Sequence, residues 1–113
     1  MPTIFNKIIK KEIPAKIVYE DDDILAFEDI APKAPVHILI IPKKDIKTLN
    51  DIKEEDANLI GPLTIVAKKI AKDKNINQDG YRLVMNCNDY GGQTVYHIHL
   101  HLIGGRKLSW PPG

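Results

Sequence analysis

Histidine occupies positions 97, 99 and 101 of the chain, and isoleucine or leucine occupies the positions between and after them. On a β-strand, alternate side chains point to opposite faces, so this spacing predicts one imidazole face and one apolar face. The turn Gly91-Gly92-Gln93-Thr94 precedes the histidines and supplies backbone N–H donors and a hydroxyl. An imidazole surface beside such a turn is suited to chemistry, or it is simply an exposed polar face.

Metal binding is one chemistry that fits. Two histidines at i and i+2 on a strand can ligate Zn²⁺, and His37 would complete a three-histidine set. Cys87 is the only cysteine, so the chain has no cysteine pair to close a structural zinc site. The sequence favours no metal, but the residue types alone leave this alternative open.

Nucleophilic attack on phosphorus is the other chemistry. A neutral imidazole attacks well when its second nitrogen donates to a fixed acceptor. A phosphorus centre also needs donors around its non-bridging oxygens as charge develops. Residues 91–94 can supply those donors, and no Walker-type or dinucleotide-binding glycine motif competes with this interpretation.

The elements that would position these groups alternate short strands with two helices. Thr3 is suited to cap a helix from Ile4 that is closed by Pro14, and Asp51 is suited to begin a long helix that runs to about Asp73 and is kinked at Pro62. The apolar patterns predict strands at residues 16–20, 24–28, 36–41, 81–86 and 95–103, with a polar loop at 87–92. Short turns between neighbouring strands predict an α+β fold: a five-stranded, mostly antiparallel sheet with helices packed on it.

Length and charge limit the classes of protein to consider. A chain of 113 residues suits one domain, and 16 basic against 15 acidic residues give no case for bulk attraction to nucleic acid or to an anionic membrane. No apolar run approaches the roughly 20 residues of a membrane helix, and a single cysteine is typical of a reducing compartment. We expect a cytoplasmic protein, for which entry into a nucleus is also open.

The run from His97 to Ile103 resembles the His-φ-His-φ-His-φ-φ motif of the histidine triad (HIT) superfamily, where φ is apolar. The rest of the chain resembles its histidine triad nucleotide-binding (Hint) branch. The matching stretches are Ile4-Phe5, residues 11–16, Ala26-Phe27, Asp29-Ile30, Ala34-Pro35, residues 41–44, residues 91–93 and the final Trp110-Pro111-Pro112-Gly113. The resemblance covers nearly all of residues 1–113 and implies a single HIT domain, with 106–113 as an irregular tail.

The resemblance implies a purine nucleoside phosphoramidase, which hydrolyses the P–N bond of AMP joined to an amine. His99 would be the nucleophile and would form a transient nucleotidyl-histidine. His97 would orient it, His37 would stand behind as part of a relay, and His101 would contact the phosphate and the leaving group. Thr94, where the branch usually has serine, would bind the phosphate or assist protonation of the leaving group.

The resemblance also implies a substrate pocket. Asp29 would bind the ribose hydroxyls, unless it only caps the turn before Pro32. Asn86 and the backbone of Gly92 and Gln93 would face the ribose and phosphate. The apolar residues of the base pocket would be Ile4, Phe5, Ile8, Ile13, Phe27 and Ile30. No cofactor is implied.

Members of the branch are homodimers whose tails reach toward the partner's site, and Trp110 is the tail residue that fits this.

The sequence departs from the branch at Ser109, at Asp45 and in the loop Cys87–Tyr90. Two other functions stay open: Fhit-like hydrolysis of dinucleoside polyphosphates, and a nucleotide-binding regulator or scaffold in which chemistry is incidental.

Overall fold

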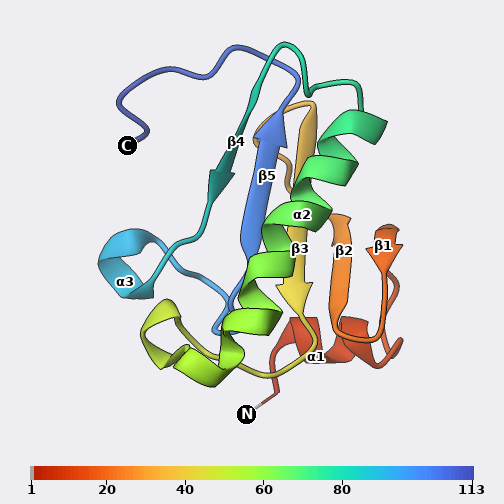
Figure 1. Cartoon of the computed structure of the whole chain (residues 1–113), viewed down its shortest axis with the longest axis vertical. Helices are drawn as coiled ribbons and strands as arrows, with labels where there is room; N and C mark the ends of the chain where they lie inside the picture. Colours follow the sequence, from red (N-terminus) through yellow and green to blue (C-terminus); the bar gives the residue numbers. More distant parts are fainter. Residues whose placement is uncertain (1) are drawn as a thin grey trace.

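Five strands form one antiparallel sheet in the order β1-β2-β3-β5-β4 (Figure 1). The strands are β1 (Ile17–Glu20), β2 (Ile24–Glu28), β3 (Val36–Pro42), β4 (Tyr81–Val84) and β5 (Leu100–Gly104). In this computed structural model, which describes residues 2–113, every strand pairing is antiparallel. The expected α+β architecture is confirmed, and β2 and β3 are apolar on both faces because helices cover both sides of them.

Helix α2 (Ala57–Asp73) lies across one face of the sheet (Figure 1). Its buried residues Leu63, Val66, Ala67, Ile70 and Ala71 pack against Ile24, Ala26, Ile38, Ile40, Leu100 and Leu102. The long helix expected from Asp51 begins later, because two 3-10 turns, Leu49–Asp51 and Glu54–Asp56, precede it. The carboxylates of Asp51 and Asp56 each accept the backbone N–H three residues back and so close separate turns. The kink at Pro62 stays a prediction.

Helix α1 (Ile4–Ile9) covers part of the opposite face of the sheet. Thr3 caps it as expected, since its Oγ1 accepts the N–H groups of Phe5 and Asn6. The helix ends at Ile9, well before Pro14, and Lys11 then takes a left-handed backbone with φ of 62°. Phe5 and Ile8 pack on Leu25, Phe27, Leu39 and Ile41.

The predicted strand at 95–103 is wrong over its first half. Strand β5 begins at Leu100, and residues 95–99 approach it as an irregular segment. The backbone of that segment bonds outside the sheet: the Ile98 N–H donates to the Ile46 carbonyl at 2.8 Å. The alternation of burial survives, because Ile98, Leu100 and Leu102 are all in the interior.

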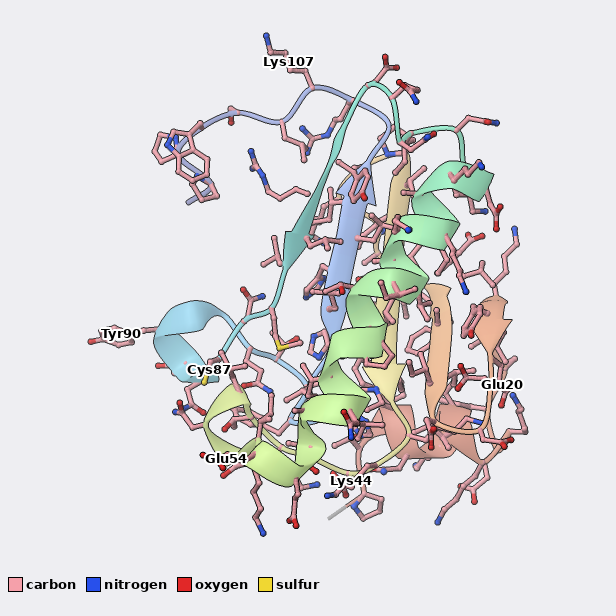
Figure 2. The ribbon with its side chains drawn as sticks, in the orientation of Figure 1. Glu20, Lys44, Glu54, Cys87, Tyr90 and Lys107 are labelled. Atoms are coloured by element: carbon pink, nitrogen blue, oxygen red, sulfur yellow. The ribbon has the colours of Figure 1, made fainter. Side chains whose placement is uncertain are left out.

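Two smaller predictions also need correction. The strand expected at 81–86 ends at Val84, and the expected loop 87–92 contains a short helix, α3 (Asn88–Gly91). Gly92, with φ of 82°, ends α3, and the Gln93 side chain accepts the Asn88 N–H. Tyr90 on α3 projects away from the body of the protein (Figure 2).

The last residues, 105–113, contain no helix or strand and run outward from β5 past β4 (Figure 1). Trp110 in this tail is 81% exposed, and its ring lies under the Arg82 guanidinium at 5.8 Å. Among the described residues, no helix is both long and apolar enough to cross a membrane.

Candidate active site

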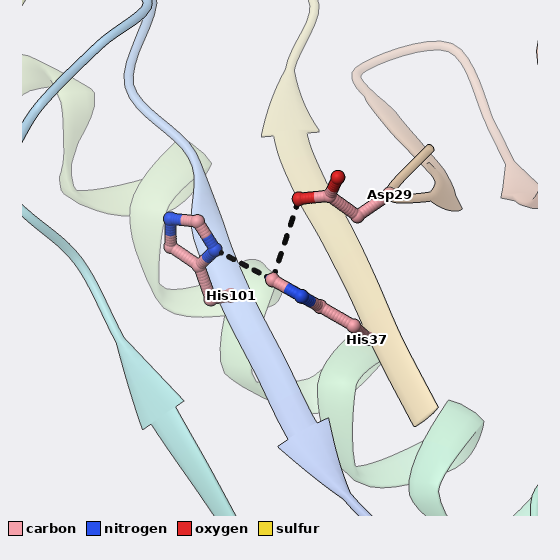
Figure 3. Close-up of side chains that lie close together, drawn as sticks. All are labelled: Asp29, His37 and His101. Atoms are coloured by element: carbon pink, nitrogen blue, oxygen red, sulfur yellow. Dashed lines mark hydrogen bonds and ion pairs between the residues drawn. The ribbon is translucent and has the colours of Figure 1, made fainter. Parts of the chain in front are cut away.

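The face of the sheet that α1 partly covers carries the histidines. His37 lies on β3 and His101 on the neighbouring β5, and their Nε2 and Nδ1 atoms are 2.9 Å apart (Figure 3). The rings of His99 and His101 follow in contact, with centroids 4.9 Å apart, and Phe5 packs edge-on against His99 at 5.1 Å. The three rings therefore form a continuous row from His37 to His99.

The hydrogen bonds of His37 fix the direction of this row. The backbone N–H of Lys33 donates to Nδ1 of His37 at 3.0 Å, so we assign the ring hydrogen of His37 to Nε2. That hydrogen donates to Nδ1 of His101, which leaves His101 with its own hydrogen on Nε2. Burial lowers the pKa of His37, and burial together with the charges of His99 and His37 lowers the pKa of His101 to about 4. Both rings are therefore neutral near pH 7.

His99 is held in the tautomer that a nucleophile needs. Its Nδ1 lies 2.8 Å from the carbonyl oxygen of His97 and donates to it, so the lone pair is on Nε2. Burial lowers the pKa of His99, which keeps that lone pair free at neutral pH. His99 therefore combines an available nitrogen with a fixed acceptor behind it.

His97 is placed differently from its two neighbours. It is fully buried, and its Nε2 donates to the carbonyl oxygen of Pro42 at 2.7 Å. It does not line the cleft described next; its contact with the row is through its carbonyl oxygen and through the edge of the Phe5 ring, 6.0 Å away. That His97 orients His99 stays a prediction.

An open cleft of about 490 Å³ lies beside the histidine row, in the size range of small-molecule sites. His99, His101, Thr94 and Asp29 stand along it. Its remaining walls are apolar except for Glu28: Ile4, Phe5, Ile8, Ile13, Pro14, Ala15, Phe27, Ile30, Leu39 and Val95. The structure thus brings together the expected base pocket, Asp29, the hydroxyl of Thr94 and two of the three triad histidines.

Asp29 has two contacts from one carboxylate. Its Oδ1 accepts the N–H of Ala31 at 2.8 Å, which is the turn-capping role considered from the sequence. Its Oδ2 lies 3.5 Å from Nε2 of His37 and belongs to the wall of the cleft (Figure 3). Asp29 therefore caps the turn with Oδ1, and Oδ2 still faces the site.

Four expected substrate contacts lie outside this cleft. Asn86 lines a separate surface hollow with Arg82 and the tail, and the Trp110 ring lies under the Arg82 guanidinium. Gly92 caps α3, and the buried Gln93 side chain donates to the carbonyls of Lys47 and Val95. In the single chain, Gln93 is a structural tie between segments.

Sequence reasoning missed several residues of the site. The Lys33 N–H and the Pro42 carbonyl fix tautomers through backbone atoms, so their residue types carry no signal. Pro14, Ala15 and Val95 enter the cleft from loops. Leu39 could have been found, because it shares the alternate positions of its strand with His37.

Asp29, His37 and His101 form the one cluster of possible metal ligands among residues 2–113. A cation at this place would need a lone pair on Nε2 of His37. Because the Lys33 N–H occupies Nδ1 of that ring, Nε2 carries the hydrogen and acts as a donor. The donor set therefore suits a hydrogen-bonded relay better than it suits a metal ion.

Known proteins resemble this chain over almost its whole length. A family model described as "HIT domain" matches residues 10–108. The purine nucleoside phosphoramidase of Escherichia coli is 58% identical over 107 residues, which cover 95% of this chain and 90% of that protein. An uncharacterized HIT-like protein of Synechococcus elongatus is 57% identical over 111 residues, 98% of this chain and 96% of its own.

A solved structure agrees with the fold. The crystal structure of a HIT family hydrolase from Legionella pneumophila superimposes with a TM-score of 0.97 at 55% sequence identity, covering 99% of this chain and 100% of that one. The two chains therefore share the fold and more than half of their aligned residues.

Proposed function

The chain belongs to the HIT domain family, and from that premise we propose that it is a purine nucleoside phosphoramidase, a hydrolase that cleaves the P–N bond between AMP and an amine. The observation that carries the proposal is His99: its Nδ1–H is fixed on the His97 carbonyl, and its Nε2 lone pair is available beside an apolar cleft. A neutral imidazole held in this way is a nucleophile for phosphorus.

The first step forms a bond between Nε2 of His99 and the α-phosphorus and breaks the P–N bond. The departing nitrogen takes a proton from the His101 Nε2–H or the Thr94 hydroxyl, the two side-chain donors of the cleft. In the second step, water attacks phosphorus, the P–N bond to His99 breaks, and the proton of the water returns to the donor. AMP and the amine are the products.

The walls of the cleft suit a nucleoside. Phe5 and Phe27 are in edge-to-face contact at 5.4 Å and offer apolar surface to a purine ring. Asp29, at the same cleft, has an acceptor oxygen for the ribose hydroxyls. In the proposed binding mode, the phosphate lies toward Thr94, His99 and His101.

Comparing substrates tests the proposal. The purified chain is assayed with an AMP phosphoramidate and with a dinucleoside polyphosphate, and the quenched protein is examined by mass spectrometry for an added AMP. We expect a higher kcat/KM for the phosphoramidate and an AMP adduct on His99. Preference for the polyphosphate would favour the Fhit-like alternative, and AMP binding without turnover would favour a regulator.

We extend the proposal to the assembly and the location of the protein. The whole chain is taken as a single HIT domain that works as a homodimer in the cytoplasm, with entry into a nucleus also open. The exposed Trp110 supports the dimer, because a large apolar ring on an irregular tail is stabilised when a partner covers it. Light scattering on the purified protein distinguishes a mass of two chains from one.

A further inference from the structure

The Nδ1 atom of His97 has no role in the reaction proposed above. His97 is fully buried, and its Nε2 already donates to the Pro42 carbonyl, so the neutral ring presents Nδ1 as an acceptor. No hydrogen-bond partner reaches that atom, and it is the one buried side-chain nitrogen or oxygen in this condition within residues 2–113. Such an atom beside the histidine row calls for an explanation.

Asp45 is the group that faces this nitrogen. Its Oδ1 lies 3.9 Å from Nδ1 of His97, and the side chain is about half exposed. A carboxylate and a ring lone pair are both acceptors, so they form no hydrogen bond while the ring is neutral. A proton on Nδ1 changes this, because the imidazolium still donates to the Pro42 carbonyl through Nε2 and forms an ion pair with the Asp45 carboxylate 3.9 Å from Nδ1.

The segment that carries Asp45 is tied to the triad on both sides of His97. The Ile98 N–H donates to the Ile46 carbonyl at 2.8 Å, and the Gln93 side chain donates to the Lys47 carbonyl at 2.7 Å. The carboxylate is therefore held near the ring by backbone atoms of neighbouring residues. Its position does not depend on a flexible loop alone.

His97 in turn is linked to the nucleophile through its carbonyl, which accepts the Nδ1–H of His99 at 2.8 Å. A positive charge on the His97 ring is therefore close to the His99 ring. A cation there opposes protonation of His99, because two positive rings so close repel each other.

We propose that Asp45 is a positioning residue for the proposed phosphoramidase reaction. It acts through His97: the first proton taken up by the triad goes to Nδ1 of His97, and the nucleophile His99 therefore stays neutral. The inference rests on the proposed function for its consequence, but its structural part stands on the contact between Asp45 and His97. Asp45 is one of the positions where the sequence departs from the Hint pattern.

Several groups around the His97 ring affect its pKa. The Pro42 carbonyl and Asp45 raise its pKa, whereas burial, the largest effect, lowers it, as do Lys47 and His99. Lys47 also pairs with Asp45 at 3.1 Å and so competes with His97 for the carboxylate. From α1, the ring is contacted by the uncharged Phe5. Removing Asp45 or Lys47 should therefore change the protonation of His97 in opposite directions.

Titration of the histidine ring nitrogens by ¹⁵N NMR tests this directly. In Asp45→Asn we expect the pKa of His97 to fall by about one unit, and in Lys47→Gln we expect it to rise. Asp45→Glu should restore most of the wild-type value. Asp22→Asn, which removes an exposed carboxylate from the β1–β2 turn, is the matched control and should leave His97 unchanged.

The pH profile of kcat/KM for an AMP phosphoramidate gives the second readout. In Asp45→Asn the acid limb should move to higher pH by about half a unit while the plateau stays within about threefold, because His99 then takes up the first proton. A His97 pKa that is the same in the wild type, Asp45→Asn and Lys47→Gln would show that Asp45 does not affect the protonation of His97. A His97 pKa that moves while the acid limb stays fixed would overturn the role in the reaction. Absence of turnover by the wild type would overturn the proposed function instead, and the NMR titration would still decide the contact.

Discussion

His37 Nε2 lies 2.9 Å from His101 Nδ1, although 64 positions separate the two residues in the chain. The β3–β5 register pairs His37 with Ile103 and Leu39 with His101, so the two histidines are diagonal neighbours on one face. Diagonal pairs are within reach of long or ring side chains, and the Lys33 N–H then makes His37 the donor and His101 the acceptor. The relay is thus a consequence of strand register and of one backbone hydrogen bond.

Replacing the nucleophile separates catalysis from binding. In His99→Ala we expect kcat for an AMP phosphoramidate to fall by at least about a thousandfold, because no other ring nitrogen in the cleft has the same fixed tautomer. Calorimetry should still detect AMP binding, since the apolar walls and Asp29 remain. Turnover near the wild-type rate would show that His99 does not form the intermediate.

The Thr94 hydroxyl can be tested with two substitutions of similar size. Thr94→Val removes the hydroxyl and keeps the shape, and we expect kcat to fall by about ten- to a hundredfold, the range for a lost hydrogen bond to a charged group. Thr94→Ser keeps the hydroxyl and should stay within about threefold of the wild type. Equal rates for the serine and valine variants would remove Thr94 from the proposed mechanism.

Asp29 should contribute to the recognition of ribose. In Asp29→Asn we expect KM for the ribonucleoside phosphoramidate to rise by about tenfold or more, because an ionised acceptor binds hydroxyls more strongly than an amide oxygen does. A 2′,3′-dideoxy substrate lacks those hydroxyls, so its KM should change little between the wild type and the variant. A parallel loss on both substrates would point to the contact with His37 instead.

Protein stability should fall as the pH is lowered from 6.5. Above that value the histidines are neutral in both the folded and the unfolded chain, so they contribute nothing to the pH dependence. Between 6.5 and about 4 the unfolded chain binds protons that the folded chain does not, because burial lowers the pKa of His37, His97 and His99 and lowers that of His101 to about 4. His101 alone should account for about 2 kcal/mol of the loss in free energy of unfolding by pH 5.

Urea unfolding at pH 7 and pH 5 measures this effect in a range where unfolded carboxylates are still mostly ionised. The His101→Gln variant should show a smaller difference between the two pH values, since it lacks one of the four groups. An unchanged difference in that variant would mean that His101 is protonated in the folded chain near pH 5.

Two glycine substitutions should change stability in opposite directions. Gly105 has φ of 90°, and a Cβ there would lie 2.9 Å from the Pro35 side chain, so Gly105→Ala should lower the free energy of unfolding by about 1–3 kcal/mol. Gly61 lies within α2 with open space around it, so Gly61→Ala should raise that free energy by about 0.5–1 kcal/mol. Thermal melting of both variants is the measurement.

The sequence by itself determined the class of fold and most of the elements. The Thr3 cap, the strand at 24–28 and the apolar positions of the long helix depend on local spacing, which can be read without the rest of the chain. The alternating histidines and the resemblance carried by residues 97–103 pointed to His99, but alternation predicted a strand where the structure has an irregular approach to β5.

Only the tertiary structure decided how the four histidines differ. His97 points into the interior, His99 has a free Nε2, and His37 donates to His101, because the folded backbone brings a particular carbonyl, N–H or ring nitrogen to each ring. Those partners are backbone atoms of Pro42, Lys33 and His97, or a ring set beside another by strand register. Neither kind depends on a residue pattern near the histidine, so the tautomer and the reactivity of each ring follow from the fold and not from its position in the sequence.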